Sequence, residues 1–287
     1  MPRHPSLSSW GNAEAGTPHI SLVLLTGVDR LAIDAVAFSL ADSRPAIHVV
    51  AYDVAPDPAS STGLSLVRTV CEPGNSDSLL GCDTTVFPMD DCCLTCACKH
   101  DLVRVTNAAP EWSGAVLSVL PVGVEGTAVA QYLADSSMLG DLPCAIDTIH
   151  VATAVGLDGF ESRLFDDDRL VIAGTTDDDA VLDSRSTGVV QTRLIREASH
   201  ILMLPMLLAD GGAALTDGST ALGGAGLGGA DLEGTAVSPR QGADETARLS
   251  AIVTALADPA ATIHPDVHCT DLHALIGDVC TPPRVRV

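Results

Sequence analysis

Short apolar runs alternate with stretches of helical periodicity along most of this chain, and this alternation constrains the fold more than any other feature. The runs have the length of strands and are rich in Val, Ile and Leu: 19–25, 46–52, 114–120, 146–153, 200–204 and 261–265. The stretches that follow them carry apolar residues at helical spacing: 29–40, 127–139, 157–165, 187–198 and 244–256. Strands that alternate with helices pair in parallel and are buried on both faces. The pattern therefore predicts an α/β fold with a doubly wound, mostly parallel sheet.

Length and composition place the alternating region in one domain. The chain has 287 residues, of which 46% are hydrophobic and 18% charged, as in a globular protein with a sizeable core. We predict a disordered or extended segment over 1–18, a single α/β domain over 19–278 and a tail over 279–287. Two stretches break the alternation. Residues 53–83, rich in Pro and Ser, predict a loop or short hairpin, and residues 209–242, rich in Gly and Ala, predict a flexible insertion.

The charge balance argues against one large class of partners. Acidic side chains number 37 and basic ones 15, which gives a formal net charge of −22. Nucleic acids and anionic membranes attract clustered Lys and Arg, so we expect no direct binding to nucleic acid and none to a membrane. No apolar run reaches the roughly 18 residues of a membrane span, and residues 1–17 lack the apolar core of a signal peptide. We therefore expect a cytoplasmic protein.

The turn after the first predicted strand is the place where a nucleotide would bind in such a fold. Ligands of parallel sheets lie at the carboxyl ends of the strands, and a phosphate-binding loop needs two glycines, a lysine and a Ser or Thr. Gly27 supplies the first glycine, but the other three positions hold unsuitable residues: Ala32, Ile33 and Asp34. Arg30 is a cation that could replace the lysine, whereas Asp34 would repel phosphate. Gly27, Arg30 and Asp34 are thus candidate remnants of a nucleotide site, and the sequence argues against GTP and Mg²⁺ as cofactors.

Four cysteines lie within seven residues and form the strongest chemical signal in the sequence. Cys93 and Cys96 form a C-x-x-C pair, whose spacing lets two thiolates reach one zinc ion. Cys92 and Cys98 lie close enough in the sequence to be further candidate ligands. In a long chain without a secretion signal, such a cluster indicates metal or redox chemistry rather than a disulfide framework. We predict a zinc site at Cys93 and Cys96, and thiol redox chemistry stays open as an alternative because a helix can begin at this pair.

This cluster and the order of the elements resemble the CobW-like GTPases, cytosolic P-loop proteins linked to metal delivery and zinc homeostasis. The family motif Gly-Cys-x-Cys-Cys-Thr-x-Arg-x-Asp-Leu is similar to residues 92–102, in which Cys93 and Cys96 match the outer cysteines and a threonine replaces the middle one. Residues 198–204 resemble the strand before the family's guanine-reading Asn-Lys-x-Asp, and that motif is absent from 204–207. The resemblance implies a fold of P-loop GTPase type with degenerate nucleotide motifs.

The combined loss of the lysine, the hydroxyl and the guanine reader is similar to a degenerate CobW-like branch, which is associated with zinc limitation and ribosome hibernation. Val119-Leu120-Pro121 and Glu125 also resemble that branch. The resemblance implies a pseudo-GTPase, not an active enzyme, that recruits a partner in response to zinc. The implied partner is the ribosome or a hibernation factor, and the charge of −22 favours contact with a basic protein over RNA. Two alternatives remain: a zinc metallochaperone GTPase in which Arg30 serves an altered phosphate site, and a thiol redox sensor.

Overall fold

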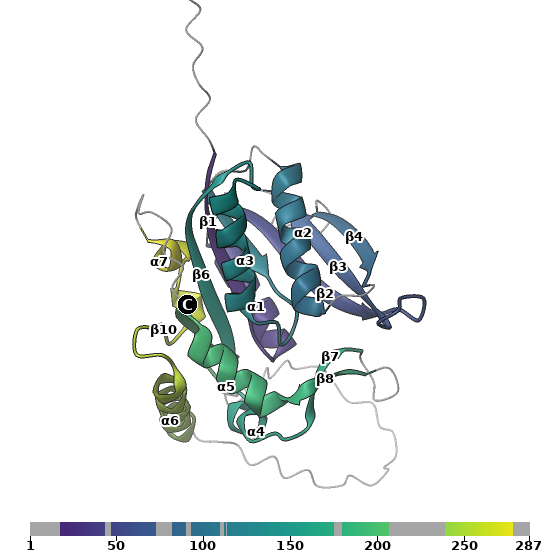
Figure 1. Cartoon of the computed structure of the whole chain (residues 1–287). Coiled ribbons are helices and arrows are strands. Elements are labelled where there is room, and N and C mark those ends of the chain that lie inside the picture. The colour runs from purple at the N-terminus through teal and green to yellow at the C-terminus, as the bar shows by residue number, and fades with distance from the viewer. Residues whose placement is uncertain are drawn as a thin grey trace, which may run out of the picture.

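Six neighbouring strands of the eight-stranded central sheet pair in parallel (Figure 1). The computed structural model describes residues 18–43, 47–72, 82–89, 93–109, 112, 114–174, 180–206 and 239–277. The strand order is β10-β9-β6-β1-β5-β2-β3-β4. The parallel strands are β1 (His19–Thr26), β2 (Ile47–Pro56), β5 (Gly114–Val119), β6 (Ala145–Gly156), β9 (His200–Leu204) and β10 (Thr262–His264). The predicted α/β fold with a mostly parallel sheet is confirmed.

The sheet ends in an antiparallel extension at the β2 side. β3 (Leu64–Cys71) pairs antiparallel with β2, and β4 (Cys82–Pro88) pairs antiparallel with β3. The hairpin alternative for residues 53–83 is thus confirmed, although the strands are longer than a short excursion. A disulfide joins Cys71 to Cys82, which face each other across β3 and β4. The sequence pattern did not predict this disulfide, since the expectation of metal or redox chemistry concerned only the cysteines at 92–98.

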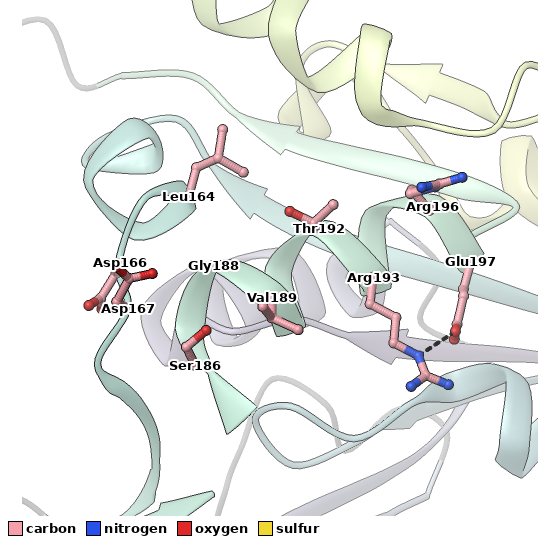
Figure 2. A pocket seen from close by; sticks show the side chains of 10 residues that line it. All are labelled: Leu164, Asp166, Asp167, Ser186, Gly188, Val189, Thr192, Arg193, Arg196 and Glu197. Atoms are coloured by element: carbon pink, nitrogen blue, oxygen red, sulfur yellow. Dashed lines mark hydrogen bonds and ion pairs between the residues drawn. The ribbon is translucent and has the colours of Figure 1, made fainter. Parts of the chain in front are cut away.

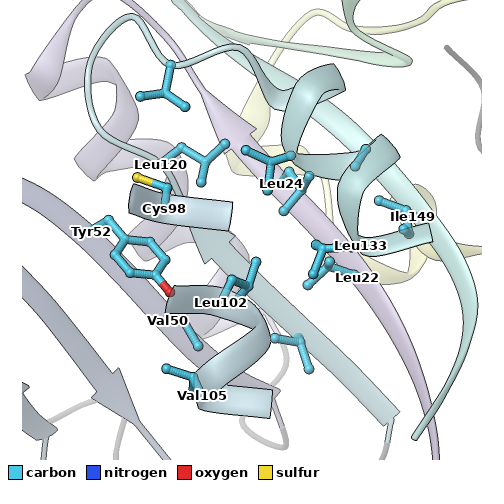
Figure 3. Close-up of a cluster of buried hydrophobic side chains, with 14 of the residues drawn as sticks. Leu22, Leu24, Val50, Tyr52, Cys98, Leu102, Val105, Leu120, Leu133 and Ile149 are labelled. Carbon is cyan, nitrogen blue, oxygen red and sulfur yellow. The ribbon is translucent and has the colours of Figure 1, made fainter. Parts of the chain in front are cut away.

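Helices cover both faces of the sheet because the central strands are apolar on both sides. Leu22 and Leu24 of β1 contribute to a core under α2 (Leu94–Ala108) and α3 (Gly126–Leu139), part of which is seen in Figure 3. Val23 and Leu25 alternate to the opposite face, where α1 (Arg30–Asp42) and α7 (Leu272–Ile276) pack. β1 is therefore an inner strand, paired with β5 on one side and β6 on the other and covered by helices on both faces.

A third group of elements packs beside β6 and β9. It consists of α4 (Phe160–Leu164), α5 (Thr187–Glu197) and α6 (Pro239–Leu256), and its core includes Phe160, Ile195 and Val253. Between α4 and α5 lies a separate two-stranded antiparallel sheet of β7 (Arg169–Ala173) and β8 (Val181–Ser186), which the sequence pattern did not predict. A short 3-10 helix, η2 (Val267–Cys269), precedes α7.

Three segment predictions fall largely outside the described residues. Of the predicted segment 1–18 only Pro18 is described, and the tail 279–287 lies wholly outside. Residues 209–238 of the predicted insertion also lie outside, whereas the end of that insertion is helical because α6 begins at Pro239.

Among the helices that the structure describes, none combines the length and the apolar character needed to cross a membrane.

Candidate thiol and loop sites

The cysteine pair lies at the start of α2. Cys93 is the N-cap residue of this helix, and its Sγ accepts a hydrogen bond from the backbone N–H of Cys96 at 3.4 Å. The N-terminal end of a helix carries a partial positive charge, which favours an anion such as a thiolate. The Cys93 side chain is exposed and that of Cys96 is partly exposed. The sequence therefore places two adjacent thiols at a surface position that suits their ionised form.

The surroundings of Cys93 change its acidity. Burial alone would raise the pKa of the Cys93 thiol, but hydrogen bonds from Cys96 and the backbone of Thr95, together with the charge of Lys99, hold that pKa below its ordinary value. Lys99 is the only lysine in the chain, and its ammonium lies 5.0 Å from the ring centre of Tyr132 on α3. Because the thiolate is the form that binds metals and attacks disulfides, Cys93 is chemically the more competent cysteine of the pair.

The four candidate zinc ligands are not equivalent. Cys93 and Cys96 lie together, whereas Cys98 is fully buried in the core beside Tyr52 and Leu120 (Figure 3). Cys92 lies outside the described residues. Stable structural zinc sites use four ligands, and in the described part of the chain no three His, Cys, Asp or Glu side chains form a group that could hold a metal. The described residues thus supply two thiols that fit half of a zinc site.

After β1, the backbone N–H groups at the start of α1 are already hydrogen-bonded to a side chain of the loop. Asp29 is the N-cap of α1, and its carboxylate accepts hydrogen bonds from the backbone N–H groups of Leu31 at 3.0 Å and Ala32 at 3.2 Å. In a phosphate-binding loop, N–H groups at this position face the bound anion. The Asp29 carboxylate therefore takes the donors that a phosphate would need.

Arg163 on α4 holds the Asp29 carboxylate in this position. Its Nη1 lies 3.2 Å from Oδ2 of Asp29, and its Nη2 donates to the backbone carbonyls of Gly156 and Asp158 at 2.7 Å each. Gly156 ends β6, the strand next to β1. The guanidinium thus joins the N-terminal end of α1 to the end of β6, at the edge of the sheet where ligands of this fold class bind.

The three candidate nucleotide residues have internal roles. Arg30 forms ion pairs with Asp34 on its own helix and with Asp53 on β2. Gly27 allows close packing, because a Cβ there would lie 2.8 Å from Cγ1 of Ile33. The structure therefore brings Arg30 and Asp34 together, but as partners of each other instead of as ligands of a phosphate.

A pocket of about 640 Å³ between the turn after α4 and α5 was not predicted from the sequence (Figure 2). Asp166 and Asp167 line one side, and Arg193 and Arg196 line the other. Nη2 of Arg193 lies 2.8 Å from Glu125, and its Nε donates to Glu197 at 2.7 Å. The lining mixes both charges, so it selects neither an anion nor a cation.

Three histidines from neighbouring strands form a row that sequence reasoning also missed. His200 on β9 lies between His264 on β10, at 3.1 Å, and His150 on β6, at 3.2 Å. Burial lowers the pKa of His264. Each contact can hold one proton between two ring nitrogens, so both contacts are compatible with three neutral rings.

These features define an α/β protein with a mostly parallel sheet, a surface pair of thiols and a self-capped loop after its central strand. No protein-family model matches the chain, and comparisons with curated proteins and with solved structures found no match either.

Proposed function

We propose that this protein is a CobW-like pseudo-GTPase that binds zinc and recruits a partner in response to it. The observation that carries the proposal is the placement of Cys93 and Cys96 together at the exposed start of α2. The lowered pKa of the Cys93 thiol supports it, because zinc binds the thiolate. The order of the elements also fits the resemblance: a central strand with its loop and helix comes first, and the cysteine helix follows after the hairpin.

Cys93 and Cys96 would hold the zinc ion, which supplies a positive charge and a fixed geometry when bound. Cys98 is excluded from this role by its burial in the core. Cys92, the neighbour of Cys93 in the sequence, is the candidate for a third ligand. A site with fewer than four protein ligands leaves positions open to water or to a partner. Such a site suits a protein that responds to zinc better than one that needs zinc in order to fold.

The alternative of a metallochaperone GTPase is disfavoured by the loop after β1. A phosphate at the N-terminus of α1 would have to displace the Asp29 carboxylate and would meet Asp34 on the same helix. Arg30 would also have to leave Asp53 before it could reach a phosphate. We therefore propose a binding protein without nucleotide hydrolysis.

The proposed partner is the ribosome or a hibernation factor in the cytoplasm, as the resemblance implies. The net charge of −22 supports contact through a basic protein surface. Affinity purification from zinc-poor and zinc-rich cells tests this part. If the two sets of partners are identical and free of ribosomal components, recruitment in response to zinc is refuted.

Zinc stoichiometry is the direct test of the site. Reduced protein should bind one zinc ion in calorimetric titration, and the Cys93→Ser/Cys96→Ser variant should lose that binding because both thiolates are removed. Cys269→Ser, which removes an exposed cysteine on η2, serves as the matched control and should bind as the wild type does. A wild-type protein that stays metal-free in excess zinc, or a double variant that binds equally well, would contradict the proposal.

A further inference from the structure

We propose that Cys93 and Cys96 also perform thiol–disulfide exchange with small dialkyl disulfides such as glutathione disulfide, with Cys93 as the attacking thiol. This activity uses the metal-free pair and does not depend on the zinc proposal. It rests on the position of the two side chains at the start of α2 and on their contact with each other.

The geometry assigns different roles to the two cysteines. Cys93 precedes the first turn of α2 and is exposed, so an external disulfide can approach its sulfur. Cys96 lies one turn further along the helix, is less exposed, and hydrogen-bonds to Cys93 through both its side chain and its backbone N–H. An exposed thiol next to a more protected one is the arrangement in which the first attacks and the second resolves the intermediate.

The exchange conserves atoms and electrons in two steps. The Cys93 thiolate attacks one sulfur of glutathione disulfide, the sulfur–sulfur bond breaks, and one glutathione leaves as a thiolate while the other stays bound to Cys93. Cys96 then loses its proton to the solvent and attacks the Cys93 sulfur, and the second glutathione leaves as a thiolate. Two protein thiols are oxidised to one disulfide, and one glutathione disulfide is reduced to two glutathione thiols.

The other described cysteines are less suited to this reaction. Cys71 and Cys82 are already joined in a disulfide. Cys98 and Cys144 are buried, and burial raises the pKa of the Cys144 thiol. Cys269 is exposed, but its thiol donates to the Asp266 carboxylate at 3.6 Å, so it is an internal reference for a surface thiol beside an acidic group.

Mass spectrometry of trapped products tests the proposal. Reduced protein in a metal chelator is mixed with glutathione disulfide, quenched with an alkylating agent and digested. We expect a Cys93–Cys96 disulfide in the wild type and a stable glutathione adduct on Cys93 in Cys96→Ser. In Cys93→Ser, the reaction at Cys96 should be roughly tenfold slower or more, because the favoured thiolate is absent. The Cys269→Ser variant should form the Cys93–Cys96 disulfide at the wild-type rate.

A second measurement separates chemistry from folding. At one fixed pH, a small alkylating agent should modify Cys93 faster than Cys269 in the same molecule, because Cys93 lies at the N-terminal end of α2 whereas the Cys269 thiol faces the Asp266 carboxylate. Equal reactivity of Cys93 and Cys269, or a disulfide that joins Cys93 to Cys92 instead of Cys96, would overturn the proposal. If the wild-type protein exchanges disulfides but binds no zinc, only the zinc function is refuted. If it binds zinc but does not exchange disulfides, only the exchange is refuted.

Discussion

At the scale of single residues, Asp101 fixes α2 to the antiparallel part of the sheet. Its side chain is only 4% exposed and lies 3.0 Å from Arg68 on β3 and 3.2 Å from Arg104 on its own helix. Arg68 is 17% exposed, whereas Arg104 is 64% exposed. A buried carboxylate is tolerated only when it is paired, so this contact holds the cysteine helix in its position.

Removal of the Asp101 carboxylate should therefore destabilise the folded protein. Asp101→Ala leaves the largely buried Arg68 without its carboxylate, and we expect the free energy of unfolding to fall by about 3–5 kcal/mol. Arg104→Ala is the matched control, because it removes the exposed partner of the same carboxylate and should cost less than about 1 kcal/mol. Urea denaturation of both variants measures the difference, and equal losses would show that burial of Arg68 does not determine the effect.

The thiol pair could be predicted from the sequence, whereas the closure of the loop after β1 could not. Cys93 and Cys96 are three residues apart, so any helix that begins there brings them together. Arg163 contacts Asp29 only because β6 pairs with β1. A contact between residues so far apart in the sequence leaves no signal in the local residue pattern. The burial of Cys98 was hidden for a related reason, since the face of α2 that packs on the sheet depends on the tertiary arrangement.

At the scale of secondary-structure elements, the sequence predicts the presence of the apolar strands better than their ends. β1, β5, β9 and β10 were predicted within one residue at each end, whereas β2 and β6 extend four and three residues past the predicted runs. β4 and β8 contain several polar side chains and are partly exposed, so only their antiparallel partners define them as strands. α6 begins before its apolar periodicity does, because proline suits the first position of a helix.

The histidine row across β6, β9 and β10 predicts a pH dependence. Because burial lowers the pKa of His264 in the folded protein, the unfolded chain binds more protons as the pH falls below about 6.5. The free energy of unfolding should therefore decrease as the pH is lowered from 7 towards about 5. His264→Gln removes this contribution and should flatten the decrease, whereas the exposed His273→Gln should not. Chemical denaturation at several pH values measures the slopes, and identical slopes for all three proteins would contradict this account.

At the scale of the whole molecule, the excess of acidic residues dominates the electrostatics. Ion pairs neutralise some carboxylates locally, but the net charge of −22 remains distributed over one chain. Repulsion within such a molecule opposes the compact state and also makes a basic partner surface the favourable one. This property could be predicted completely from the sequence, because a sum of charges does not depend on which residues are neighbours.

Salt should consequently stabilise the protein. Screening by about 300 mM NaCl, relative to about 20 mM, weakens long-range repulsion more than it weakens close ion pairs. We expect the thermal midpoint to rise by about 2–4 °C, as for a gain of about 1 kcal/mol. The rise should shrink as the pH approaches the sequence pI of about 4.4, where the net charge is small. A midpoint that falls with salt at neutral pH would show that ion pairs outweigh the repulsion.

Ile33 sets a limit on how this chain could change in evolution or by engineering. The position at which a phosphate-binding loop carries its lysine is here 2% exposed and packs in the core under α1. A lysine introduced there would lose apolar contacts and place an ammonium group among aliphatic side chains, a cost of several kcal/mol before any ligand arrives. Nucleotide binding at this loop would also require the removal of Asp29 and Arg163 from it. A chain that acquired such binding stepwise would therefore pass through destabilised intermediates.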